Sequence, residues 1–261
     1  MKILVILGSG RKNGNTDLAC GIIREELEKI AAAQAVPLEI ETIPLGMAKI
    51  TACRGCRSCF DRGEDRCPYK DDLAGVREKM RAADGLLITS PVYVDDVSGL
   101  VKNWIDRIAH ACHRPEFCGK CAYALVTTGG SSTGHALRTL TIALSTWGYH
   151  IVGKQGLATG ARMKPEEMRT QYQVRLQKIA QQFFKALHER QFARPTFFSL
   201  MMFRIQQIGW KQADPETVDF HYWESKGWFE PSCDFYIPHQ GNPLKTVIAR
   251  ATGTLISRFV S

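Results

Sequence analysis

A glycine-rich polar loop that follows an apolar run is the feature that most constrains how this chain can fold. Residues 3–7 are Ile-Leu-Val-Ile-Leu, residues 8–16 are Gly-Ser-Gly-Arg-Lys-Asn-Gly-Asn-Thr, and an amphipathic helical pattern begins near Asp17. Glycines let backbone N–H groups turn toward a common point, and the following helix adds unpaired N–H groups and the positive end of its dipole. This order of strand, loop and helix predicts an α/β fold whose first loop binds a phosphate group.

Two common phosphate-binding loops do not match this one. The dinucleotide fingerprint requires a glycine where this chain has Asn13, and the nucleoside triphosphate loop requires a lysine where it has Asn15. A site for a single terminal phosphate fits better, and a Gly/Asn-rich turn without a ligand is the alternative. The candidate phosphate-binding side chains are those of Ser9, Arg11, Asn15 and Thr16.

Apolar runs and helical patterns continue to alternate along the chain. We expect strands at 38–43, 85–89, 122–128 and 149–154, and helices near 18–30, 73–80, 100–108, 133–147 and 166–190. Five strands separated by helices predict a doubly wound, five-stranded parallel sheet, with the strictly alternating strand 38–43 at an edge.

Ligands of such sheets bind outside the carboxyl ends of the strands. Three loops are expected there: the phosphate loop 8–16, a loop at 90–98 and the glycine loop 127–130. A flat ring could lie between the last two loops, beside Tyr93 and the backbone at Gly129. For Tyr93 alone, ordinary surface packing is the more common explanation, so the prediction rests on the three loops together.

Charge and apolar content narrow the possible partners. The net charge is +8, but the Lys and Arg residues are scattered, which argues against a nucleic-acid surface and suits anionic small ligands or an acidic redox partner. No apolar run approaches the roughly 20 residues of a membrane span, and the chain starts directly with its first strand, without a signal peptide. A cytoplasmic location is expected.

Four of the nine cysteines form a compact array in an irregular segment. Cys53, Cys56 and Cys59 are separated by two residues each, and Cys67 follows with a proline after it. This spacing resembles that of ferredoxins and favours a [4Fe–4S] cluster. Zinc is the alternative metal, although zinc sites more often use two separated pairs, and a loop without a cluster is the third possibility. The other five cysteines are expected to serve packing.

The loop 8–16, Ser90-Pro-Val-Tyr93 with Ser98-Gly99 and Lys102, Asp106-Arg107, and Thr128-Gly-Gly130 together resemble the flavodoxin-like NADPH-dependent FMN reductase superfamily. The resemblance covers about residues 1–185, and the cysteine array is similar to that of its iron-sulfur flavoproteins. Gly10 departs from the family, which usually has proline there. The resemblance implies FMN with its phosphate at Ser9, Arg11, Asn15 and Thr16, and with its isoalloxazine against Pro91, Val92, Tyr93 and Val94 and against Thr128, Gly129 and Gly130.

The implied activity is that of an FMN-dependent oxidoreductase or electron-transfer flavoprotein with a [4Fe–4S] cluster. FMN would take a hydride from NAD(P)H, or electrons from a carrier, for a small-molecule or protein acceptor, and no side chain needs to act as acid or base. The alternatives are a cluster-free NAD(P)H-dependent FMN or quinone reductase and a non-enzymatic flavodoxin-like redox carrier.

Two regions are expected. Residues 1–190 would form the FMN-binding domain with a cysteine-rich insertion at 44–70, and residues 191–261 a helical and irregular extension that caps the sheet domain or joins subunits into a homo-oligomer. The apolar stretch 197–208 is too short to span a bilayer. Attachment to a membrane surface is a weaker possibility, favoured only by Lys245, Arg250 and Arg258 near the closing helix.

Overall fold

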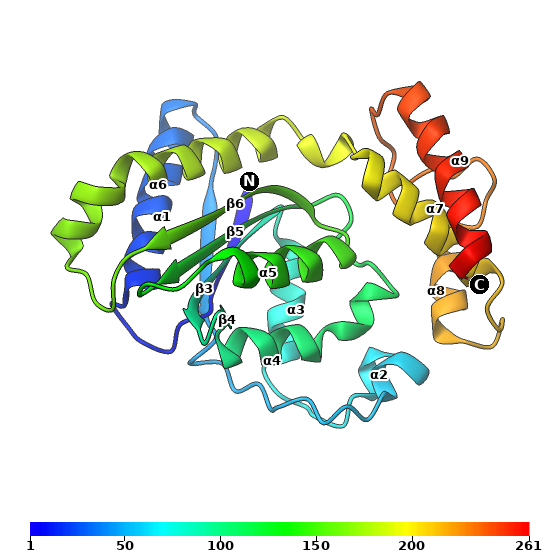
Figure 1. The fold of residues 1–261 in the computed structure, drawn as a ribbon, viewed down its shortest axis with the longest axis horizontal. Coiled ribbons are helices and arrows are strands. Elements are labelled where there is room, and N and C mark those ends of the chain that lie inside the picture. The colour runs from blue at the N-terminus through cyan, green and yellow to red at the C-terminus, as the bar shows by residue number, and fades with distance from the viewer. Residues whose placement is uncertain (261) are drawn as a thin grey trace.

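A five-stranded parallel sheet forms the centre of the computed structural model, which describes residues 1–260 of the chain. The strands are ordered β2-β1-β3-β5-β6, and β2 lies at an edge, as expected (Figure 1). Their bounds are β1 Lys2–Leu7, β2 Glu39–Pro44, β3 Gly85–Tyr93, β5 Cys121–Thr128 and β6 His150–Ala158. The predicted flavodoxin-like α/β architecture is therefore confirmed.

Helices cover both faces of the sheet (Figure 1). On one face, α1 (Asn15–Ala33) packs against α6 (Pro165–His188), and their apolar sides bury one side of the strands. On the other face, α3 (Leu73–Ala82), α4 (Gly99–Arg107) and α5 (Gly134–Thr146) form a second core. The central strands are buried on both faces, which explains why their sequences are continuous apolar runs.

The segment expected to be a loop at 90–98 is instead a short hairpin. Strand β3 continues through Tyr93, and β4 (Asp96–Val97) returns antiparallel to it with Val92 opposite Val97. Val94 and Asp95 form the two-residue turn, with φ angles of 50° and 66°. Two consecutive left-handed residues match the twist of a tight hairpin, so the carboxyl end of β3 is more rigid than the sequence suggests.

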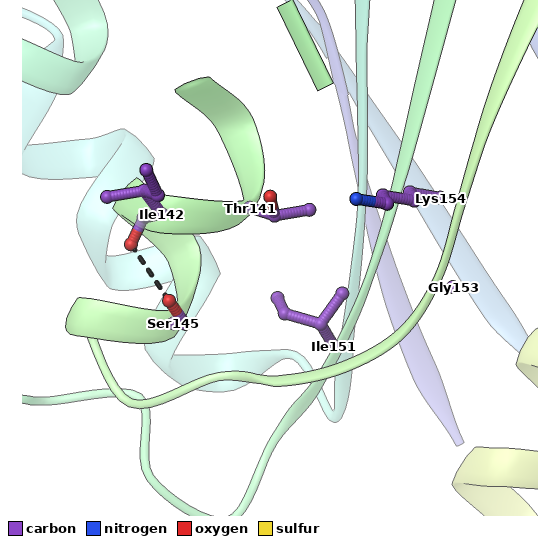
Figure 2. Close-up of a pocket in the computed structure, with 6 residues that line it drawn as sticks. All are labelled: Thr141, Ile142, Ser145, Ile151, Gly153 and Lys154. Atoms are coloured by element: carbon purple, nitrogen blue, oxygen red, sulfur yellow. Dashed lines mark hydrogen bonds between the residues drawn. The ribbon is translucent and has the colours of Figure 1, made fainter. Parts of the chain in front are cut away.

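The opposite edge of the sheet is left open. A pocket of about 400 Å³ lies there between α5 and β6, and its lining residues are shown in Figure 2. Lys154 is its one charged lining residue, and its ammonium group points toward Thr141. The pocket lies at the side of the sheet and not at the carboxyl ends of the strands, so it is separate from the expected ligand crevice.

The C-terminal extension is mainly helical and gathers at one end of the molecule (Figure 1). It contains η3 (Gln191–Ala193), α7 (Phe197–Lys211), α8 (Val218–Ser225) and α9 (Pro243–Val260). Phe203, Trp223 and Trp228 form a small aromatic core of its own. No described helix is long and apolar enough to cross a bilayer.

The cysteine-rich insertion is mostly irregular, with one turn of helix at α2 (Ser58–Asp61) and a 3₁₀ turn at η1 (Glu64–Arg66). A second 3₁₀ turn, η2 (Ala109–Cys112), follows α4. The insertion crosses below α4 and brings α2 toward α8 of the extension (Figure 1). It is therefore held between the sheet domain and the extension.

Candidate functional site

The loops that follow β1 and β3 are tied together by short hydrogen bonds. The Gly8 amide donates to the Thr89 carbonyl at 2.8 Å, and the Ser98 hydroxyl donates to the Gly8 carbonyl at 2.7 Å. A Cβ atom on Gly8 would lie 2.2 Å from Val101 Cγ2 and 2.5 Å from the Thr89 carbonyl oxygen. Glycine is therefore required at the point where the phosphate loop leaves the sheet.

The phosphate loop and the start of the following helix carry hydrogen-bond donors that an anion could contact. Ser9 is buried, and its hydroxyl accepts a hydrogen bond from the Arg11 amide at 3.2 Å. The Arg11 side chain is exposed. Helix α1 begins at Asn15 after an extended Gly14, with no side chain capping its first turn. The first amides of α1 and the Arg11 guanidinium are thus the groups available to an anion.

Asn15 and Thr16 lie beside the loop, but their side chains bind neighbouring strand ends. The Asn15 amide nitrogen donates to Thr159 Oγ1 at 2.8 Å and to the Gly160 carbonyl at 2.9 Å, while its oxygen accepts from the Met163 amide. Thr16 Oγ1 lies 2.7 Å from Thr127 Oγ1 and is buried. In this arrangement the backbone N–H groups of both residues lie at the N-terminus of α1, while their side chains fix the phosphate loop against the ends of β5 and β6.

The loop after β6 was missed by the sequence analysis. We expected that strand to end at residue 154, whereas β6 continues to Ala158 and brings Thr159 and Gly160 beside the phosphate loop. The alternation of small and polar residues at 155–160 gave no clear strand signal. Pairing with β5 extends this strand, since Thr128 lies opposite Ala158.

The hairpin and the glycine loop flank the other side of the crevice. Pro91 and Val92 are buried in β3, whereas Tyr93 is 46% exposed and Val94 is fully exposed at the hairpin tip. In the neighbouring loop, Thr128 Oγ1 accepts hydrogen bonds from the amides of Gly130 and Ser131 at 3.2 and 3.0 Å. Gly129 and Gly130 are exposed. The hairpin tip, with Tyr93 and Val94, thus faces solvent near the turn at Gly129 and Gly130, which carries no side chains.

The four cysteines of the insertion line one pocket of about 320 Å³. All four are free thiols, and the left-handed residues Gly55 and Arg57 turn the chain between Cys53, Cys56 and Cys59. Within residues 1–260, no three His, Cys, Asp or Glu side chains converge closely enough to hold a metal ion. The chemistry of the pocket fits a cluster, because thiols are the main potential ligands that share it. The thiols would have to close together to bind one.

Helix α4 connects the hairpin that follows Ser90 to the cysteine pocket. Ser98 caps its N-terminus by accepting a hydrogen bond from the Val101 amide, and Arg107 closes its last turn. Arg107 donates to the Thr51 carbonyl at 2.7 Å, to the Asp71 carboxylate at 2.7 and 3.2 Å, and to Cys67 Sγ at 3.7 Å. Both ends of the insertion are thereby held by one buried guanidinium.

Asp71 is kept ionised by this arrangement. Burial alone would raise the pKa of its carboxyl, but hydrogen bonds from Arg107 and from the amides of Thr51 and Leu73 lower that pKa to about 2. A carboxylate with two or three such donors stays charged throughout the physiological range. The Arg107–Asp71 pair is thus a permanent anchor of the insertion.

A second buried guanidinium, from the segment that follows η2, links the insertion to the extension. Arg114, whose side chain is 2% exposed, pairs with Asp219 of α8 and donates to the Cys59 carbonyl. His113 Nδ1 lies 2.8 Å from the other oxygen of Asp219, and the Trp223 indole donates to the His113 carbonyl at 2.8 Å. No local pattern in the sequence marks His113, Arg114 and Asp219 as a group, because Asp219 lies far from the other two along the chain.

Residues 1–162 match the family model for NADPH-dependent FMN reductase. The chain is 26% identical to an iron-sulfur flavoprotein of Archaeoglobus fulgidus, over 87% of this chain and 99% of that protein. It is 30% identical to an iron-sulfur flavoprotein of Methanosarcina thermophila, over 64% of this chain and 85% of that protein.

A solved flavone reductase has the same fold, with a TM-score of 0.58 and 16% identity over 75% of this chain and 66% of that chain. At this identity the likeness concerns the fold alone.

The His113–Asp219 contact generates a prediction about pH. The hydrogen bond to Asp219, and a smaller one involving Cys112, raise the pKa of His113 from 6.5 to about 9. A histidine with a raised folded-state pKa stabilises the protein fully below its unfolded-state pKa and loses this effect as pH rises through the folded-state value. The wild type should therefore exceed His113→Gln in free energy of unfolding below about pH 6.5, and this difference should shrink between about pH 6.5 and about 9 and be lost above that.

Urea unfolding across this pH range measures the difference. The same pair of proteins in an Asp219→Asn background is the control, since His113 then lacks the carboxylate that holds its proton. A difference that does not change with pH in the wild-type background would contradict Asp219 as the cause.

Proposed function

The chain belongs to the NADPH-dependent FMN reductase family, and from this premise we propose that it is an FMN-dependent oxidoreductase that carries a [4Fe–4S] cluster. The observation that carries the FMN site is the convergence of the phosphate loop, the hairpin and the glycine loop: the Ser98–Gly8 hydrogen bond joins the first two, and the Thr16–Thr127 contact joins the first and the third. FMN, when bound, would supply the hydride acceptance and single-electron release that side chains cannot.

Each loop has a distinct task in this proposal. Arg11 and the first amides of α1 bind the phosphate, because they are the donors that remain available there, and the buried Ser9 hydroxyl shapes the loop by accepting from the Arg11 amide. Tyr93 and Val94 flank the ring as exposed apolar groups, and the Gly129 and Gly130 backbone approaches its polar edge. The open hairpin tip leaves room for a nicotinamide donor to stack on the ring.

The cluster ligands would be Cys53, Cys56, Cys59 and Cys67. Their shared pocket supports this set, as do the names of the iron-sulfur flavoproteins to which the chain is similar. Arg107 donates to Cys67 Sγ, so it would offset negative charge on that thiolate and raise the reduction potential of a bound cluster. A reducing cytoplasm is the compartment that would keep these thiols available.

The distance between the proposed flavin site and the cysteine pocket also bears on how subunits assemble. Ser98 borders the flavin loops and Arg107 contacts Cys67, so α4 separates the two regions, and its nine residues span about 13 Å. We propose a homo-oligomer in which the flavin nearest to a cluster belongs to another subunit. The acceptor would be a small molecule or a redox protein.

Two alternatives remain open. A cluster-free NAD(P)H-dependent FMN or quinone reductase is favoured by the separation of the four thiols in the described chain. A non-enzymatic redox carrier would use the same crevice without a nicotinamide. Flavin reduction by NADPH separates the carrier from the enzymes.

The phosphate assignment predicts the effect of Arg11→Ala. Loss of a charge-assisted hydrogen bond should weaken FMN binding by about 1.5–3 kcal/mol, which is roughly a 10- to 150-fold rise in Kd. Fluorescence titration of the apoprotein with FMN measures the change. Lys12→Ala is the matched control, because it removes a neighbouring exposed cation outside the assigned phosphate contacts. Equal affinity for Arg11→Ala and wild type would show that the phosphate binds elsewhere.

The cluster assignment predicts the composition of anaerobically purified protein. It should contain about four iron and four sulfide per chain, and Cys56→Ser should abolish the broad visible absorption of the cluster while FMN stays bound. Cys233→Ser is the control, since its thiol only donates to the Phe235 carbonyl and lies outside the cysteine pocket. Zinc would appear as metal without sulfide. Stoichiometric FMN with neither iron nor sulfide would leave a plain flavin reductase.

The enzyme proposal predicts that NADPH bleaches the flavin absorption of the protein under anaerobic conditions, because a hydride passes to the ring. Stopped-flow absorbance with NADPH and with NADH measures the rate. Dithionite is the control that shows the bound flavin to be reducible. Bleaching by dithionite with no response to either nicotinamide would assign the protein to the carrier class.

A further inference from the structure

Helix α9 presents its large apolar side chains to solvent and its small side chains to the protein. Leu244, Val247, Ile248, Leu255 and Phe259 are 68%, 64%, 49%, 57% and 82% exposed. At about 100° per residue these five positions fall within an arc of about 120°, so they form one continuous stripe. We call these five residues the α9 stripe.

The opposite side of α9 carries the packing contacts. Thr246 and Ala249 are buried, and a Cβ atom on Gly253 would lie 2.8 Å from the Met201 carbonyl oxygen of α7. The helix therefore approaches α7 closely through small residues. Its largest apolar side chains are exposed in the described chain, and α9 itself lies at the end of the molecule that is formed by the extension (Figure 1).

All charged residues of the packed helices α7 and α9 are basic. Helices α7 and α9 contain five basic residues and no acidic residue: Arg204, Lys211, Lys245, Arg250 and Arg258. The acidic residues of the extension lie between them in sequence, at 214–234.

These cations are not neutralised by carboxylates. Lys245 donates to the Pro195 carbonyl, and Arg250 donates to the carbonyls of Cys233 and Pro231. Arg204 bonds to Thr254 Oγ1, and its pKa is lowered by burial and then by repulsion from Arg250. Hydrogen bonds to neutral oxygens leave the positive charge of the helix pair in place.

We propose that the α9 stripe is a docking surface for an anionic lipid bilayer. An amphipathic helix with an apolar face flanked by Lys and Arg lies in the plane of the membrane interface, where its apolar face enters the headgroup boundary and its cations meet anionic lipids. A second copy of this chain would bring the same positive charges together, which opposes self-association through this face. The charge complementarity therefore selects the lipid surface over a second copy.

Sedimentation of the full-length holoprotein with vesicles tests this proposal. Vesicles of equal parts phosphatidylcholine and phosphatidylglycerol should bind it, and phosphatidylcholine vesicles should bind it at least about tenfold more weakly, with the difference falling as salt is added. Leu255→Asp should lower binding to the anionic vesicles by about tenfold or more, and Arg258→Glu by a similar factor.

Val174→Asp is the matched control, because Val174 is 66% exposed on α6 of the other region. It should bind the anionic vesicles as the wild type does. Phe259→Asp provides a second variant if Leu255→Asp unfolds at a lower temperature than the wild type. Equal binding to both vesicle types, or no binding to either, would overturn the proposal. So would a dimer in light scattering that Leu255→Asp dissociates, since a second copy would then cover the stripe.

Discussion

The hydrogen bond from Ser98 to the Gly8 carbonyl is the contact on which the geometry of the candidate site depends. It joins the end of β1 to the hairpin that follows β3, and the same hydroxyl caps α4. The contact requires the two backbones to meet so closely that position 8 has no room for a Cβ atom. A ligand crevice between parallel strands needs its loops fixed relative to one another, and here one buried serine does this for two of them.

The other end of α4 serves the cysteine-rich insertion. Arg107 donates hydrogen bonds to the Asp71 carboxylate, a backbone carbonyl and a cysteine sulfur. The irregular insertion is therefore held by the regular helix α4. A buried ion pair of this kind adds little net stability compared with apolar packing, but breaking it leaves a buried charge without a partner. Its role is therefore to define where the insertion lies. The Arg114–Asp219 pair does the same between the insertion and the extension.

The extension thus has two different faces. Its inner face contacts the sheet domain and the insertion through Asp219 and Trp223, which are both buried. Its outer face carries the α9 stripe, where large apolar side chains remain exposed. A capping role, which the sequence left open, accounts for the first face only. The second face has the composition of an interaction surface, because exposed apolar patches are typical of sites that are buried against a partner or a membrane.

The sequence by itself determined the alternation of strands and helices, the edge strand 38–43, the position of the phosphate loop and the grouping of four cysteines, because each follows from local periodicity or spacing. Only the tertiary structure decided that Asn15 binds the loop after β6, that Ser90 to Ser98 folds as a hairpin, and that Arg114 finds Asp219. These contacts join residues far apart in the chain, or depend on a neighbouring strand for pairing, so no local pattern specifies them. The same holds for α9: its periodicity shows an apolar stripe, but only packing against α7 through Ala249 and Gly253 decides that this stripe faces outward.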